Sequence, residues 1–144
     1  MNRGIDMPHL VLSGQISQKK KIIQYIANLE KALGINRMWS KVIFLNFKTE
    51  VDGSYGDCWG DSKDGYVEIN IARKLEGKKI PFEEIMSTIA HEMVHAKQYL
   101  RNELNGYSTT WKGRNAGGYK YENQPWEREA LRLETKLYQE CWPK

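Results

Sequence analysis

One pentapeptide in this chain has the residue types and the spacing of a catalytic metal site. Residues 91–95 read HEMVH, with two histidines four positions apart and a glutamate directly after the first. On a helix, residues four apart lie one turn apart on the same face, so His91 and His95 can reach one ion. Imidazole nitrogen is a common zinc ligand, and zinc lowers the pKa of a bound water towards neutrality. We expect Glu92 to take a proton from that water as a general base.

The residues around this motif predict a buried helix that positions it. The helical pattern runs from Pro81 to about Asn102, and proline suits the first helical position. Its apolar positions recur at helical spacing, at Ile85, Ile89, Met93, Ala96 and Leu100. A hydrolytic metal site on a rigid core helix is therefore expected.

A catalytic zinc usually has three protein ligands, so the motif needs a third. The metzincin pattern is excluded, because the glycine and the third histidine that it requires are absent. No histidine follows His95, and His9 lies in a segment that is not expected to reach the site. A carboxylate is therefore favoured over Cys58 or Cys141. In the predicted last helix, Glu127 and Glu129 lie roughly 80° to either side of the apolar stripe, so spacing leaves both open.

Glu127 also has a structural explanation that involves no metal. If Gln124 is the N-cap of the last helix and Pro125 its first residue, Glu127 occupies the capping-box position. The two cysteines form no CxxC pair, and the N-terminus has no signal-peptide pattern. We therefore expect reduced, apolar thiols at Cys58 and Cys141 in a cytoplasmic protein without a membrane span.

The remaining elements follow from periodicity and turn residues. Helices are predicted over 15–33, 81–102 and 125–141, and strands over 41–48, 55–60 and 66–72. Asp-Gly pairs at 52–53 and 64–65 indicate hairpin-like turns, so we expect a small three-stranded antiparallel sheet. The fold class is α+β, with an N-terminal helix, this sheet, the motif-bearing helix and a C-terminal helix. The strand over 66–72 is also a candidate for pairing with an extended peptide.

The length of 144 residues fits a single domain over 1–144, with 1–14 loosely ordered and a long loop over 105–124 beside the active site. In this loop Tyr107, Tyr119 and Tyr121 are candidate oxyanion donors. Its other aromatic and basic residues are candidate contacts for substrate or single-stranded nucleic acid: Trp111, Lys112, Arg114 and Lys120. Packing of the same aromatic residues on the core is the alternative.

Positive charge is concentrated in the first third of the chain. Residues 1–48 hold eight Lys or Arg and two acidic residues, a net of +6, so residues 49–144 sum to −2 for the total of +4. Such an excess is typical of a solvated helix face, and it also fits a surface for nucleic acid.

Three segments together resemble the SprT-like zinc metallopeptidases. They read YGDCWGD, GYVEINIA and AHEMVHAKQY, and the similarity covers roughly residues 40–105. The resemblance implies a compact zincin fold that hydrolyses peptide bonds with zinc, in a family associated with protein substrates on DNA. The later histidine that is usual in SprT-like proteins is missing, which leaves the substrate open.

The segment QPWEREA resembles instead the glutamate-ligand segment of gluzincin peptidases, in which the ligand stands three residues before an alanine. That resemblance assigns the third zinc ligand to Glu127, with Ala130 as the alanine. The predicted function is a zinc metallopeptidase with Glu92 as general base. Two alternatives are a nucleic-acid-binding module with a non-catalytic zinc, and a zinc hydrolase of small amides.

Overall fold

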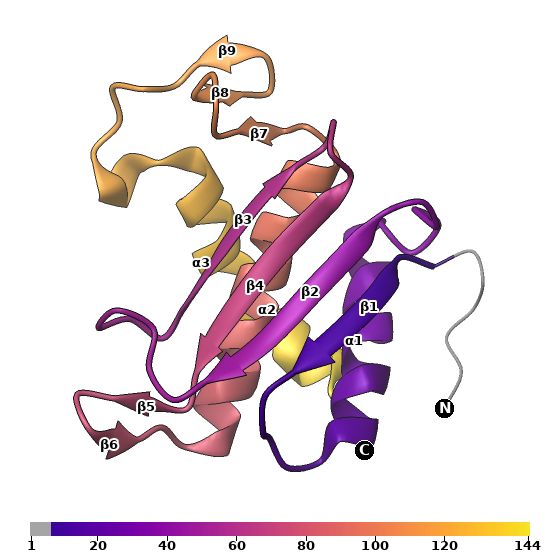
Figure 1. Cartoon of the computed structure of the whole chain (residues 1–144). Helices are drawn as coiled ribbons and strands as arrows, with labels where there is room; N and C mark the ends of the chain where they lie inside the picture. Colours follow the sequence, from indigo (N-terminus) through magenta and orange to yellow (C-terminus); the bar gives the residue numbers. More distant parts are fainter. Residues whose placement is uncertain (1–6) are drawn as a thin grey trace.

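The computed structural model describes residues 7–144, which form a sheet with helices packed against it (Figure 1). The strands of the main sheet are β1 (His9–Ser13), β2 (Val42–Lys48), β3 (Gly56–Asp61) and β4 (Tyr66–Ala72). The helices are α1 (Lys19–Leu33), α2 (Phe82–Leu100) and α3 (Pro125–Cys141). The α+β fold class is therefore confirmed, and each predicted helix and strand corresponds to an observed one.

The predicted antiparallel sheet of three strands is wrong in its pairing. The sheet has four strands in the order β1-β2-β4-β3, and only β3 and β4 are antiparallel. The turn at Asp52-Gly53 closes a single bridge between Val51 and Ser54, after which β3 runs along the far side of β4. β4 therefore enters between β2 and β3 and pairs in parallel with β2, Val42 opposite Tyr66.

Two further expectations change with this topology. β4 is hydrogen-bonded on both sides, so the predicted pairing of strand 66–72 with a peptide is wrong, and the edges of the sheet are β1 and β3. The expectation of loose order over 1–14 is wrong for residues 9–13, which form β1 and pair in parallel with β2. Residues 1–6 lie outside the described part of the chain. Residues 9–13 read HLVLS and do not alternate apolar and polar residues, so periodicity does not identify this strand.

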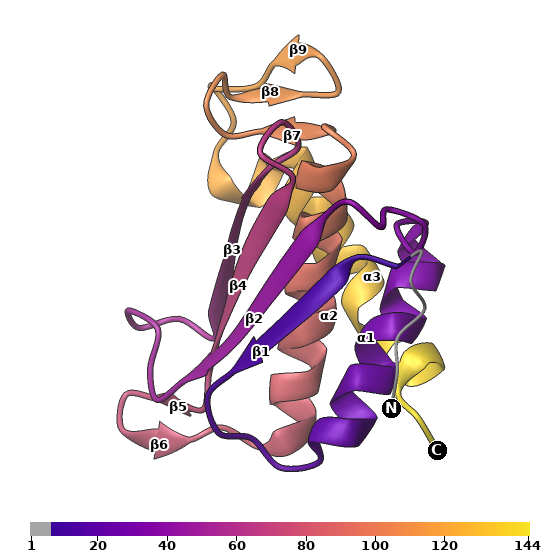
Figure 2. The same ribbon diagram turned by 45° about the vertical axis from the view of Figure 1, so that its right-hand side comes forward.

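All three helices lie on one face of the sheet, and Figure 2 shows the other face uncovered. α2 packs on β3 and β4 with one side and on α3 with the other. The strands present alternate apolar residues to the helices because successive side chains point to opposite faces. The fully or almost fully buried ones are Ile43, Leu45 and Phe47 of β2 and Val67, Ile69 and Ile71 of β4.

Small elements complete the chain. A hairpin of β5 (Lys74–Leu75) and β6 (Lys78–Lys79) joins β4 to α2. The predicted loop over 105–124 contains most of a small sheet and one 3-10 turn: β7 (Leu104–Asn105), β8 (Thr110–Trp111), β9 (Arg114–Asn115) and η1 (Tyr121–Asn123). Within residues 7–144, no helix has the length and apolarity needed to cross a bilayer.

The attachment of β1 can be tested at the glycine that follows it. Gly14 has a φ of +86°, and a Cβ there would collide with the carbonyl oxygen of Phe47. Gly34, which ends α1, has a φ of +74° with open space around it. Both alanine substitutions incur the left-handed backbone cost of about 1–2 kcal/mol. We expect Gly14→Ala to lose at least about 1 kcal/mol more than Gly34→Ala in urea unfolding, because only Gly14 adds the collision. Equal losses would show that β1 is not fixed to β2.

Candidate metal centre

Three side chains from two helices converge on one point. His91 and His95 project from α2 with their ring centroids 5.0 Å apart. Glu127, in the first turn of α3, places Oε1 3.1 Å from Nε2 of His91 and Oε2 3.0 Å from Nε2 of His95. One donor atom from each of the three residues lies within 4.8 Å of the others. Among residues 7–144, these three residues form the group of histidine, cysteine or acidic side chains that is close enough to hold one ion.

The two glutamates that spacing left open have different surroundings. Glu129 accepts hydrogen bonds from Nζ of Lys97 and from Nε2 of Gln98, each at 2.9 Å, and does not face the histidines. Glu127 does not form the capping box, because the N–H of Gln124 donates to the carbonyl of Tyr121 instead. The geometry therefore brings Glu127 to the histidine pair and leaves Glu129 beside it.

The hydrogen-bond network assigns the tautomer of His95. The amide nitrogen of Gln98 donates to the carbonyl of Trp126 at 3.0 Å and to Glu129, so its oxygen is an acceptor. That oxygen lies 2.7 Å from Nδ1 of His95, which must therefore carry a proton. In neutral His95 the lone pair is then on Nε2 and faces the carboxylate of Glu127.

His91 is oriented in the same way by an acidic residue of α3. Its Nδ1 lies 3.4 Å from Oε1 of Glu134, whose other oxygen accepts from Oγ of Ser87. A proton on Nδ1 again leaves the lone pair of Nε2 facing Glu127. Carboxylates and amides that hold the outer nitrogen of a histidine are the usual support of a metal ligand. Sequence reasoning did not assign this role to Gln98 or Glu134, although Gln98 is three residues from His95 and Glu134 two turns from Glu127.

Lone pairs that face a carboxylate repel it unless a cation lies between them. Nε2 of His95 is buried and makes no hydrogen bond of acceptable geometry, although Glu127 is 3.0 Å away. Donors bound to one tetrahedral zinc at about 2.0–2.1 Å lie roughly 3.3 Å apart. The carboxylate of Glu127 lies 3.1 and 3.0 Å from the two histidines, and the three donors lie within 4.8 Å of one another. Two imidazoles and one carboxylate are also a known donor set for catalytic zinc. The residues present therefore fit a zinc ion.

Without a metal, protons must compensate the same charges. Burial would lower the pKa of His91, but the hydrogen bond to Glu127 and the charges of nearby carboxylates raise it to about 9. Burial would also lower the pKa of His95, but the nearby carboxylates of Glu127 and Glu92 raise it, and the hydrogen bond to Gln98 contributes. Burial would raise the pKa of Glu127, but the two imidazoles that lie against its carboxylate hold it well below its usual range. The cluster thus has a strong preference for positive charge at its centre.

Glu92 stands next to this cluster but is not part of it. It is buried, with only 6% of its surface exposed. Burial raises the pKa of Glu92 to about 7, the charges of His95 and His91 oppose this, and those of Glu127 and Asp57 add to it. A carboxyl group with a pKa near neutrality can both accept and release a proton at physiological pH.

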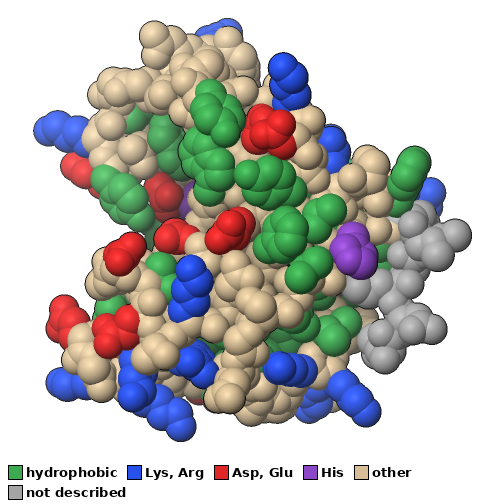
Figure 3. Space-filling model, viewed as in Figure 1, with side chains coloured by type: hydrophobic (Ala, Val, Ile, Leu, Met, Phe, Trp, Pro, Cys, Tyr) green, Lys and Arg blue, Asp and Glu red, His purple; other side chains and the backbone are tan. Residues whose placement is uncertain are grey.

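A cleft opens over His91 and Glu92. Its volume is about 310 Å³, and its walls come from the segment before β3, from α2, from η1 and from α3. The lining residues are Ser54, Tyr55, Gly56, Thr88, His91, Glu92, Tyr121, Leu131 and Glu134. Figure 3 shows the surface hollowed on its left side, with acidic side chains around the hollow. The candidate metal centre is therefore accessible from solvent.

The structure separates the three candidate tyrosines. Tyr121 lines the cleft, and its hydroxyl donates to Oε1 of Glu127 at 3.3 Å. Tyr107 packs edge-on against Trp59 and Tyr119 against Trp126, at centroid distances of 5.2 and 6.5 Å. Only Tyr121 therefore lies beside the cluster.

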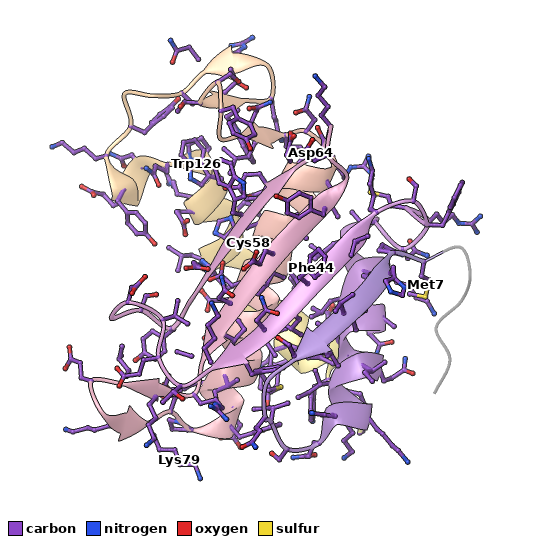
Figure 4. The ribbon with its side chains drawn as sticks, in the orientation of Figure 1. Met7, Phe44, Cys58, Asp64, Lys79 and Trp126 are labelled. Atoms are coloured by element: carbon purple, nitrogen blue, oxygen red, sulfur yellow. The ribbon has the colours of Figure 1, made fainter. Side chains whose placement is uncertain are left out.

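The other loop residues lie outside the cleft. Trp111 packs on Trp126, which Figure 4 labels beside the small upper sheet, and Nζ of Lys112 lies 5.2 Å from the Trp111 ring. Arg114 and Lys120 are exposed. The alternative in which the aromatic residues pack on their neighbours is thus seen for Trp111, while contact of these four residues with nucleic acid stays a prediction. His9 lies in β1, outside the cluster.

The two glutamates of α3 give a matched test of metal binding. Glu127→Ala should weaken zinc binding by at least about 100-fold, because one of three ligands is lost. Glu129→Ala should weaken it by about tenfold or less, because Glu129 acts on His95 only through Gln98. Competition with a chromophoric chelator measures both affinities. Tight zinc in Glu127→Ala together with loss of zinc in Glu129→Ala would reverse the assignment.

Comparison with known proteins does not assign the chain to a family. No protein-family model matches the chain, and no curated protein matches it in sequence. The resemblance to SprT-like and gluzincin peptidases therefore stays a prediction carried by its motifs, and the function must be inferred from the chemistry of the cleft.

Proposed function

We propose that this protein is a zinc-dependent peptidase of the SprT-like type, with zinc held by His91, His95 and Glu127. The observation that carries the proposal is the buried carboxyl of Glu92 beside the three-donor cluster, at the base of an open cleft. Zinc in such a site supplies a nucleophilic water at neutral pH and polarises the carbonyl of the scissile bond.

The protein's own proton carrier in this mechanism is Glu92. Burial raises the pKa of Glu92 to about 7 in the metal-free protein, and its place beside the cluster suits a group that removes a proton from the attacking water and later delivers it to the leaving amine. The burial that raises this pKa also keeps Glu92 away from competing lysine or arginine partners, since no ion pair of Glu92 with a basic side chain is present among residues 7–144.

The geometry of the sheet supports a peptide as substrate. β3 is an edge strand, and Gly56 at its start lines the cleft together with Tyr55. An extended peptide that added to this edge would run past the histidines with its backbone hydrogen-bonded to β3. This replaces β4, which has no free edge, as the candidate strand for substrate pairing.

Tyr121 is the candidate donor to the developing oxyanion. Its hydroxyl lies at the metal-binding carboxylate, on the wall of the cleft, and its ring is exposed enough to move with a substrate. A hydroxyl aimed at developing negative charge stabilises the transition state more than the ground state. The location that we propose for this activity is the cytoplasm, which suits the two free thiols of Cys58 and Cys141.

Glu92→Gln separates a peptidase from a protein whose zinc is not catalytic. We expect this variant to keep its fold and its zinc, and to lose cleavage of unfolded protein substrates by at least about 100-fold, because the general base is removed. Activity is measured with and without single-stranded DNA, alongside a small-amide panel. Cleavage that survives in Glu92→Gln contradicts the proposed mechanism, and cleavage confined to small amides favours the hydrolase alternative.

Tyr121→Phe should lower kcat by roughly 10²-fold and change KM little, since the hydroxyl is needed only as charge develops. Tyr107→Phe and Tyr119→Phe remove the same atom outside the cleft and serve as matched controls. Steady-state kinetics on one peptide compare the three variants. If all three have the kcat of the wild type, the oxyanion donor is another group.

A further inference from the structure

A second cavity lies at the opposite end of the sheet from the small upper sheet. Its volume is about 720 Å³, and it is formed where β1, β2 and β4 end and where α2 begins. Its charged lining residues are Arg73, Lys74 and Lys79, and no acidic residue lines it. Figure 3 shows lysine and arginine side chains gathered along this lower end, where Figure 4 labels Lys79. The carboxyl ends of parallel strands are a common place for ligands in open sheets.

The hairpin of β5 and β6 holds two of these cations directly opposite each other. Lys74 and Lys79 are register partners in the antiparallel pair, and both line the cavity. Like charges directly opposite on paired strands destabilise them. Neither lysine has a carboxylate partner among residues 7–144. The fold therefore keeps a repulsive pair that an anion in the cavity would relieve.

Arg73 is fixed in place without being neutralised. Its guanidinium donates to the carbonyls of Gln15 and Lys48 at 3.1 and 3.4 Å, and to Oγ1 of Thr49 at 3.1 Å. These acceptors are uncharged, so the positive charge of Arg73 is held rigidly and remains available. An arginine fixed in advance loses less conformational entropy when it binds an oxyanion.

The rest of the lining indicates what else the ligand carries. Ser17 and Thr49 present hydroxyl groups that donate to no acceptor among residues 7–144. Ile80 and Phe82 form part of an apolar wall. A volume near 720 Å³ is within the usual range of about 300–1,000 Å³ for small-molecule sites. It is far more than a single anion requires, so the ligand should combine an anionic group with an apolar or aromatic part.

We propose that this cavity binds a nucleotide phosphate, with Arg73, Lys74 and Lys79 on the phosphate and the apolar wall beside the base or sugar. Three cations and two hydroxyls whose protons have no acceptor among residues 7–144 match the charge and the several acceptor oxygens of a phosphate ester better than a single carboxylate. A free nucleotide and a nucleotide within a strand offer the same chemistry. The site is separate from the candidate metal centre, because Ile85 at the cavity and His91 lie about 9 Å apart along α2.

The test removes the charges of Lys74 and Lys79 and compares the effect on binding with the removal of two lysine charges elsewhere. Lys74→Ser/Lys79→Ser alters the cavity, and Lys31→Ser/Lys63→Ser removes the same charge from exposed positions in α1 and in the β3–β4 turn. Binding of AMP and of a short oligo(dT) strand is measured by calorimetry at fixed ionic strength, because surface charge is screened over about 8–10 Å. The cavity variant should fold at least as stably as the wild type, since a repulsion is removed.

We expect the cavity variant to bind the ligand at least about tenfold more weakly than the wild type, and the control variant to stay within about twofold. If only the cavity variant is weakened and AMP is the probe that shows it, the ligand is a free nucleotide. If oligo(dT) alone shows this difference, the ligand is a nucleotide within a strand. Equal weakening in both double variants shows a general charge effect and overturns the proposal. Absence of binding of both probes to the wild type overturns it as well.

Discussion

α2 carries polar side chains into the interior, where each of them needs a partner. Those that are buried are Glu92, His95, Lys97 and Gln98. A buried polar group without a partner costs about 1–3 kcal/mol, and a charged one more. α3 supplies most of the partners, through Glu127, Glu129 and the carbonyl of Trp126. Apolar packing alone would allow the two helices to slide, whereas these contacts fix the position of α3 on α2. The candidate metal centre is therefore inseparable from the packing of the core.

The same contacts explain which parts of the site were predictable. His91, Glu92 and His95 share one helical turn, so their relative placement follows from helix geometry alone. Glu127 and Glu129 could not be distinguished by angle, because the choice depends on what α2 places opposite each of them. Lys97 and Gln98 draw Glu129 away, and the histidines face Glu127. Tyr121 could not be selected among the loop tyrosines either, since its position depends on the turn of η1 and not on any period in the sequence.

Local sequence signals were sufficient to predict the helices and strands, but they were not sufficient to predict which strands pair. The helix predicted over 15–33 ends where α1 ends, and Gly34 follows it in a left-handed conformation. The alternation of residues in β2 and β4 specifies which side faces the helices, but parallel and antiparallel neighbours need the same alternation. The Asp52-Gly53 turn is present, but it closes only one bridge, between Val51 and Ser54. It does not pair β2 with β3. In the folded chain β4 lies between β2 and β3 and contributes Val67, Ile69 and Ile71 to the core.

The place of β4 in the sheet has a consequence during synthesis of the chain. Partners in the β2–β4 register, such as Val42 and Tyr66, are 24 positions apart, and β3 is made between them. At about 5–20 residues per second, a ribosome needs roughly 1–5 s to add those residues. For that interval the edge of β2 that pairs with β4 in the folded chain has no strand beside it. An unpaired apolar strand edge is a template for association with other chains. Nascent β2 therefore keeps an unpaired edge, open to other chains, until the β3–β4 hairpin has been made.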